Sequence, residues 1–170
     1  MKKILIAAVA LAALAGCGPF WMNPYITVEE SRLNWVEIHY YRLDKTPVYR
    51  KAVRLSGDGF VELRKGTSEL ISNDFAKHNE LGGWENIKTQ RVHVDPAHIN
   101  DIFQNLVNHG LLDQEKTFKK AKNPRKDRVL GVKATINNMA YTLQDNIFEV
   151  DPDLAEHLLD VVREFDNPTL

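Results

Sequence analysis

Hydrophobic and polar residues alternate along several stretches of the chain, and this period of two predicts β-strands. In residues 35–43, one face carries Val36, Ile38 and Tyr40, and the other carries Trp35, Glu37, His39 and Tyr41. Two further alternating runs, with Val53 and Leu55 and then Val61 and Leu63, flank residues 56–59. That Ser-Gly-Asp-Gly sequence predicts a hairpin turn. Residues 87–94, 129–136 and 139–143 also favour strands, the last two joined by an Asn-Asn turn.

Two later stretches change to a period near 3.6, which predicts helices. Asp95-Pro96 and Asp151-Pro152 each combine an N-cap aspartate with proline in the first turn. Gly110 is expected to end the first helix. A short helix is also expected at residues 72–78. The apolar stripes consist of Ile99, Ile102, Phe103, Leu106 and Val107 in the first helix, and Leu154, Leu158, Val161, Val162 and Phe165 in the second.

This order of strands, helix, strands, helix predicts an α+β domain over residues 33–170. We expect a mostly antiparallel sheet covered on one face by the two helices. The composition, 44% hydrophobic and 26% charged over 170 residues, is typical of a single globular domain and excludes a disordered chain. The first half of this domain, with Tyr49, Val53, the Gly57-Asp58-Gly59 turn and Gly66, resembles an uncharacterised group of small exported bacterial domains. The resemblance implies no activity.

The N-terminus has the pattern of a signal peptide. Lys2 and Lys3 precede an uncharged apolar run, residues 4–14, which is shorter than the ~20 residues that span a bilayer. Small residues follow. We therefore expect a cleaved signal peptide at residues 1–16 and a tether at residues 17–32.

The cleavage site has a specific form. Leu14-Ala15-Gly16-Cys17 resembles the lipobox of bacterial lipoproteins. The resemblance implies diacylglyceryl transfer to the Cys17 thiol, cleavage after Gly16, and acylation of the new amine, for example with palmitate. Gly18 in place of aspartate implies the outer membrane, facing the periplasm, if the organism is Gram-negative. Because Cys17 is the only cysteine in the chain, no intrachain disulfide is possible.

Catalytic signatures are sparse. The chain has no GxxxxGK[ST], no GxGxxG after a strand, no GxSxG and no HExxH, and we expect no cofactor. His93, Asp95 and His98 form the one candidate metal set by spacing, but Asp95 is also the expected N-cap, so the sequence favours a solvated corner here. His109 is expected at a helix C-terminus, where a partly cationic imidazole interacts favourably with the helix dipole, and His157, off the apolar stripe, is expected to face solvent. Neither needs a catalytic role.

Charge is unevenly distributed along the chain. Seven basic residues occur between positions 116 and 128, whereas residues 140–170 have eight acidic residues and one arginine. The basic segment is a candidate contact for an anionic partner, against the alternative of a solvated loop. Its basic residues are Lys116, Lys119, Lys120, Lys122, Arg125, Lys126 and Arg128.

Three functional hypotheses follow. The first is a non-catalytic binding or structural module, anchored to the membrane by acyl chains on Cys17, with an envelope protein or an anionic polymer as partner and no nucleic acid. The second is a small envelope hydrolase or metal-dependent enzyme centred on His93, Asp95 and His98. The third is an exported inhibitor or assembly accessory. A deep pocket gathering His93, His98 and His39 would indicate an enzyme. An exposed, flat apolar face with Trp35 and Tyr41 would indicate binding.

Overall fold

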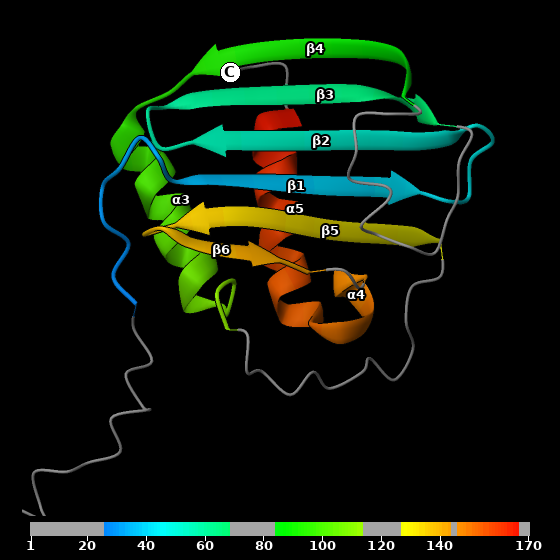
Figure 1. Cartoon of the computed structure of the whole chain (residues 1–170). Helices are drawn as coiled ribbons and strands as arrows, with labels where there is room; N and C mark the ends of the chain where they lie inside the picture. Colours follow the sequence, from blue (N-terminus) through cyan, green and yellow to red (C-terminus); the bar gives the residue numbers. More distant parts are fainter. Residues whose placement is uncertain (1–25, 69–83, 114–126, 144–145, 167–170) are drawn as a thin grey trace, which may run out of the picture.

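The protein folds around a six-stranded antiparallel sheet with helices packed against it, seen in a computed structural model that describes residues 26–68, 84–113, 127–143 and 146–166. This confirms the α+β class (Figure 1). The strands are β1 (Trp35–Arg42), β2 (Val48–Ser56), β3 (Phe60–Ser68), β4 (Glu85–His93), β5 (Arg128–Ile136) and β6 (Met139–Thr142). The helices are α3 (Pro96–Asn108), α4 (Ile147–Val150) and α5 (Pro152–Asp166).

The strand order across the sheet is β4-β3-β2-β1-β5-β6, and every pairing is antiparallel. The β2–β3 hairpin turns at residues 57–59, where Gly59 has φ +90°. The β5–β6 hairpin turns at Asn137 and Asn138, with φ of 51° and 62°, the positive values that a type I′ turn requires. Both predicted hairpins are confirmed.

One hydrophobic core joins the sheet to the helices. Side chains that lie opposite each other on neighbouring strands point to the same face of the sheet, as Ile38 and Val53 do. The apolar side chains on this face are buried. They form one cluster with the predicted stripes of α3 and α5. In Figure 1 the strands pass in front of both helices. Asp95 caps α3 through the amide of Ala97, and Asp151 accepts from the amide of Leu154 at the start of α5.

The segment before β1 is packed against the domain. Val28 is buried in the core, and its amide donates to Oε1 of Gln104 on α3. The Gln104 side chain donates in turn to the carbonyl of Ile26, while the amide of Glu29 donates to Oδ1 of Asn137. The stretch that the sequence assigned to the tether therefore contacts the folded domain at Ile26, Val28 and Glu29.

Two other details differ from the sequence analysis or lie beyond it. The short helix α4, capped by Asn146, was not predicted, because one turn is too short to show a period of 3.6. The helix expected at residues 72–78 lies outside the described residues. Within the described part of the chain, no helix has the length and hydropathy needed to cross a membrane.

Candidate functional site: the polar face of the sheet

The face of the sheet turned away from the core is polar, and we call it the polar face. The β1 register places Trp35, Glu37, His39 and Tyr41 on it, as the alternation predicts. It is not the exposed apolar surface that would have indicated a binding module, because His39 and Tyr41 are both buried and Trp35 is half-buried. Its charged residues, by register, are Glu37, Arg50, Arg54, Glu62, Arg64, Arg91 and Lys133.

His39 and Glu37 form a buried pair on β1. Nε2 of His39 lies 2.8 Å from Oε1 of Glu37. Burial lowers the pKa of His39 despite the opposing attraction of the Glu37 carboxylate, so the imidazole is neutral at pH 7. Burial acts to raise the pKa of Glu37, but its contacts with His39 and the charges of Arg64 and Arg54 outweigh burial and lower it. The face thus holds a neutral histidine beside a charged carboxylate.

Arg50 lies between two aromatic rings. Its guanidinium carbon is 4.1 Å from the centroid of the Trp84 ring and 5.0 Å from that of Tyr41. Arg50 is only 2% exposed, so these cation–π contacts form in a desolvated setting, where they are strongest. Burial raises the pKa of Tyr41 to about 12, and the phenol stays neutral. This cluster lies at the end of the polar face at which β1 meets the Val48 end of β2.

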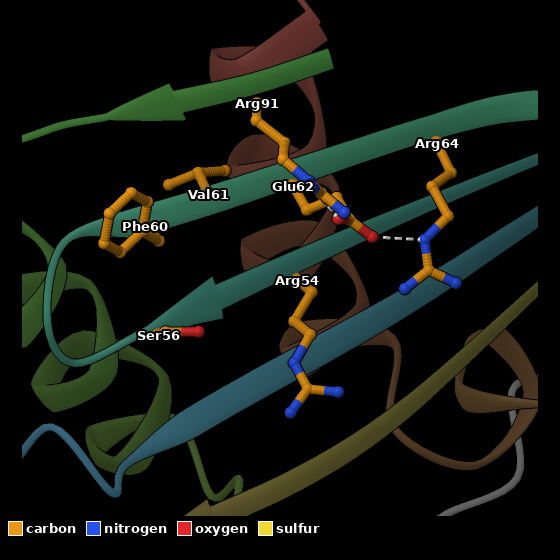
Figure 2. Close-up of a pocket in the computed structure, with 7 residues that line it drawn as sticks. All are labelled: Arg54, Ser56, Phe60, Val61, Glu62, Arg64 and Arg91. Atoms are coloured by element: carbon orange, nitrogen blue, oxygen red, sulfur yellow. Dashed lines mark hydrogen bonds and ion pairs between the residues drawn. The ribbon is translucent and has the colours of Figure 1, made fainter. Parts of the chain in front are cut away.

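A groove of about 480 Å³ lies at the opposite end of the polar face. Figure 2 shows three arginines around it, with α3 and α5 behind the strands. Glu62 on β3 sits between Arg64 and Arg91, whose Nε atoms lie 2.5 and 2.6 Å from its two carboxylate oxygens. Each guanidinium meets Glu62 through Nε, so this contact leaves its terminal Nη donors unused. The groove is lined by Arg54, Ser56, Phe60, Val61, Glu62, Arg64 and Arg91.

The electrostatics of the groove keep it positive. Burial acts to raise the pKa of Glu62, but hydrogen bonds from Arg64 and Arg91 and their charges lower it overall, so this carboxylate is ionised at neutral pH. Three guanidinium groups line the groove with one carboxylate, and Glu37 contacts Arg54 beside it, so three positive charges face two negative ones. Arrays of this kind bind carboxylates and phosphates through paired N–H donors.

Arg54 is held differently from its two neighbours. Its guanidinium carbon lies 4.7 Å from the centroid of the Trp35 ring, and its Nη1 lies 3.4 Å from Oε2 of Glu37. This side chain is 43% exposed, and that of Arg91 is 75% exposed. The two arginines therefore face solvent across the groove, while Arg64 is more enclosed.

The residues of the candidate metal set, His93, Asp95 and His98, have separate partners. Nε2 of His93 lies 3.1 Å from the carbonyl of Asp58, in the β2–β3 turn. Asp95 is used as the N-cap of α3. Nε2 of His98 lies 2.6 Å from Oε1 of Glu164 on α5.

His39 does not join the histidines of this corner, because it contacts Glu37 in the middle of β1. Among the described residues, the potential metal ligands that do come together are His109, Asp153 and His157. The deep histidine pocket that would have indicated an enzyme is thus not formed by His39, His93 and His98.

Most of the predicted basic segment lies outside the described residues, as does Cys17. Arg128 is described: it begins β5, and its Nε lies 3.2 Å from Oδ2 of Asp127. By register Arg128 pairs with Arg42 and lies on the opposite face from Glu37 and Lys133. It is therefore not part of the polar face.

Sequence reasoning missed the arginine groove because its members are far apart in the chain. A signal was nevertheless present: Arg54, Glu62, Arg64 and Arg91 all occupy the polar positions of alternating strands. Their convergence needs the order β4-β3-β2-β1, which no local pattern specifies.

Residues 1–17 match the family model described as the prokaryotic membrane lipoprotein lipid attachment site. The match supports a bacterial lipoprotein precursor, held in the cell envelope by lipid on Cys17. No curated protein matches the chain. The resemblance of the first half of the domain to small exported domains therefore finds no support here.

Proposed function

We propose that this protein is a lipid-anchored, non-catalytic binding module of the cell envelope, and that an anionic polymer binds to its polar face. The observation that carries the proposal is the groove lined by Arg54, Arg64 and Arg91, in which Glu62 is the one lining carboxylate. Like charges repel, and the three guanidinium groups exceed the two carboxylates beside them, so an added anion is attracted to this groove.

The charge of the whole polar face supports an anionic partner. Across β1 to β5 the register places five basic side chains, Arg50, Arg54, Arg64, Arg91 and Lys133, against only two acidic ones, Glu37 and Glu62. The full chain is nearly neutral, with 22 basic and 23 acidic residues. The positive charge of this face is therefore local and complementary to a negatively charged ligand.

The shape of the groove supports a polymer rather than a small anion. Arg54 and Arg91 are well exposed, and Phe60 at the groove edge is 55% exposed. The ring of Phe60 packs edge-on against His93, with centroids 4.8 Å apart. An open groove with charged donors and aromatic rings at its edges suits an extended chain that carries regularly spaced carboxylate or phosphate groups.

The anchor would hold this face in the envelope. Because glycine rather than aspartate follows Cys17, we place the protein in the outer membrane, facing the periplasm, in a Gram-negative cell. The basic residues between positions 116 and 126 are proposed as a second contact for the same kind of polymer, since their charge has the same sign.

The binding test uses the full chain, extracted from membranes in a non-ionic detergent. Polygalacturonate and polyphosphate serve as carboxylate and phosphate probes, and dextran serves as the neutral probe. The double variant Arg54→Gln/Arg91→Gln should bind the anionic probes ~10- to 30-fold more weakly at low salt, at about 1 kcal/mol for each lost charged contact. Raising the salt concentration should weaken wild-type binding and reduce the difference in affinity between the wild type and the double variant.

The matched control is Lys88→Gln/Arg163→Gln, which removes the same charge from exposed positions outside the groove. Equal weakening by both double variants would show a general charge effect and overturn the groove as the site. Binding to dextran as strong as to the anionic probes would overturn the anionic ligand. A Cys17→Ser chain that still matures and stays with the membrane fraction would contradict the lipid anchor.

A further inference from the structure

Helices α3 and α5 are joined at both ends by a histidine on α3 and a carboxylate on α5. His98 at the start of α3 contacts Glu164 near the end of α5, with 2.6 Å between Nε2 and Oε1. His109 at the C-cap of α3 faces Asp153 in the first turn of α5, with 3.5 Å between Nδ1 and Oδ2. The two histidines are eleven residues apart, as are the two carboxylates. Eleven residues make about three helical turns, so each helix uses one face for both contacts.

The end at Asp153 differs from the other because it holds a second imidazole. His157 follows Asp153 by four residues and so lies on the same side of α5. Its ring stacks on that of His109, with centroids 3.4 Å apart and an interplanar angle of 27°. One ligand atom from each of His109, Asp153 and His157 lies within 4.8 Å of the other two. Among the residues that the structure describes, these three are the histidine and acidic side chains that lie close enough together to share a metal ion.

We propose that His109, Asp153 and His157 bind a first-row transition metal ion, with Zn²⁺ as the ion of best fit. Two imidazoles and one carboxylate are the donor set of many three-ligand zinc sites, and oxygen-preferring Mg²⁺ and Ca²⁺ do not favour it. The proposal is independent of the polar face, because these residues lie on the helices that pack against the other face of the sheet.

The present separations of the three ligand atoms are close to those that the ion requires. Tetrahedral Zn²⁺ with bonds of ~2.0–2.2 Å places its ligand atoms ~3.4 Å apart, somewhat closer than the present separations of up to 4.8 Å. Asp153 and His157 are fixed to the same helix, and His109 follows the last residue of α3. Asp153 is exposed and both histidines are half-buried, so a water molecule can take the fourth position.

A bound ion would crosslink the C-terminal end of α3 to the first turns of α5. Both helices contribute their apolar stripes to the same core, so the crosslink would stabilise the folded domain. The pair at the other end, His98 and Glu164, offers a single imidazole and one carboxylate. It therefore provides a built-in comparison, with the same kind of contact between the same two helices.

The experiment uses the full chain in non-ionic detergent, purified with a histidine-free tag and depleted of metal with chelator. Isothermal titration should show one Zn²⁺ per chain, and saturating Zn²⁺ should raise the Tm by roughly 5 °C or more, whereas Mg²⁺ should not. Co²⁺ should give the visible absorption of a four-coordinate site. His157→Ala and the nearly isosteric Asp153→Asn should each weaken Zn²⁺ binding by at least ~10-fold.

His98→Ala is the matched control and should keep wild-type affinity for Zn²⁺. Circular dichroism of each metal-free variant establishes that it is folded. Asp153 is exposed, and asparagine keeps nearly the same side-chain volume, so Asp153→Asn is expected to fold. The proposal is overturned if the wild-type chain binds no Zn²⁺. It is equally overturned if Asp153→Asn and His157→Ala, both folded, bind it as well as the wild type, or if His98→Ala removes the binding.

Discussion

The chain before β1 rests on Gly57, and replacing this glycine with alanine tests how far the domain extends toward the N-terminus. A Cβ atom at position 57 would lie 2.0 Å from the carbonyl oxygen of Ser31 and 3.3 Å from that of Asn34. Gly57 does not have a positive φ, so alanine can adopt its backbone conformation and the cost is steric. The Gly57 amide also donates to Asn34 at 2.8 Å, which holds the two segments together.

The size of the effect follows from what must move. Side-chain carbons are almost never found closer than 3.0 Å to such an atom, so the Ser31 backbone must retreat by at least 1 Å or detach. Detachment exposes Val28, whose burial is worth about 1.5–3 kcal/mol. The hydrogen bonds of Val28 and Glu29 are lost at the same time, but the freed chain regains conformational entropy. We expect a loss of about 2 kcal/mol, or a Tm lower by ~4–8 °C.

Two measurements check this expectation on the detergent-solubilised chain. Thermal unfolding by circular dichroism gives the stability, and hydrogen exchange reports whether the amides of Val28 and Glu29 lose protection. Asp58→Ala is the control, since this exposed residue lies in the same turn and its carboxylate makes only a 3.4 Å contact with the amide of Phe60. A Gly57→Ala variant within ~0.5 kcal/mol of wild type, with both amides still protected, would refute the reasoning.

Two further predictions concern helix caps and pH. Asp151→Ala should destabilise the protein more than Asp95→Ala. The exposed Asp95 cap contributes ~1 kcal/mol to stability. Removing the buried Asp151 carboxylate leaves the Leu154 amide without its acceptor, which costs ~1–3 kcal/mol. Equal losses in thermal unfolding would contradict this order. Because burial lowers the pKa of His39 below its ordinary 6.5, the unfolded chain binds the extra proton, and stability should fall as the pH drops below 6.5. His39→Gln should flatten the pH dependence of Tm in that window, and an unchanged dependence would rule out His39 as its source.

The parts of the fold that the sequence predicted are those specified by neighbouring residues. Two consecutive asparagines tolerate the left-handed backbone of the β5–β6 turn, and an Asp-Pro pair both caps a helix and fixes its first φ. The burial of Val36 and Ile38, both fully inaccessible, likewise follows from alternation within one strand. Each of these features requires no knowledge of where distant residues lie.

The candidate sites could not be predicted in this way, because distant elements build them. His157 seemed solvent-facing since it lies off the apolar stripe of α5. The apolar stripe of α5 indicates which residues pack against the sheet. His157 lies beside that stripe, on the side of α5 that contacts the end of α3. Only the antiparallel packing of the two helices brings His109 next to His157. At the other candidate, His93, Asp95 and His98, the sequence favoured a solvated corner because Asp95 was the expected N-cap, and Asp95 does cap α3.

The docked N-terminal segment also limits where the polar face can act. The side-chain nitrogen Nε2 of Gln104 on α3 donates to the carbonyl of Ile26, so only residues 18–25 lie between the lipid-bearing cysteine and the packed domain. At ~3.3–3.6 Å per residue, these eight residues reach no more than about 29 Å, compared with the ~50 Å of the fifteen residues 18–32. In Figure 1 the segment that begins at residue 26 enters at the end of the sheet where β1 begins and β2 ends. The groove residues Ser56 and Phe60 lie at that same end. A polymer that binds this groove on the anchored protein must therefore lie close to the membrane surface.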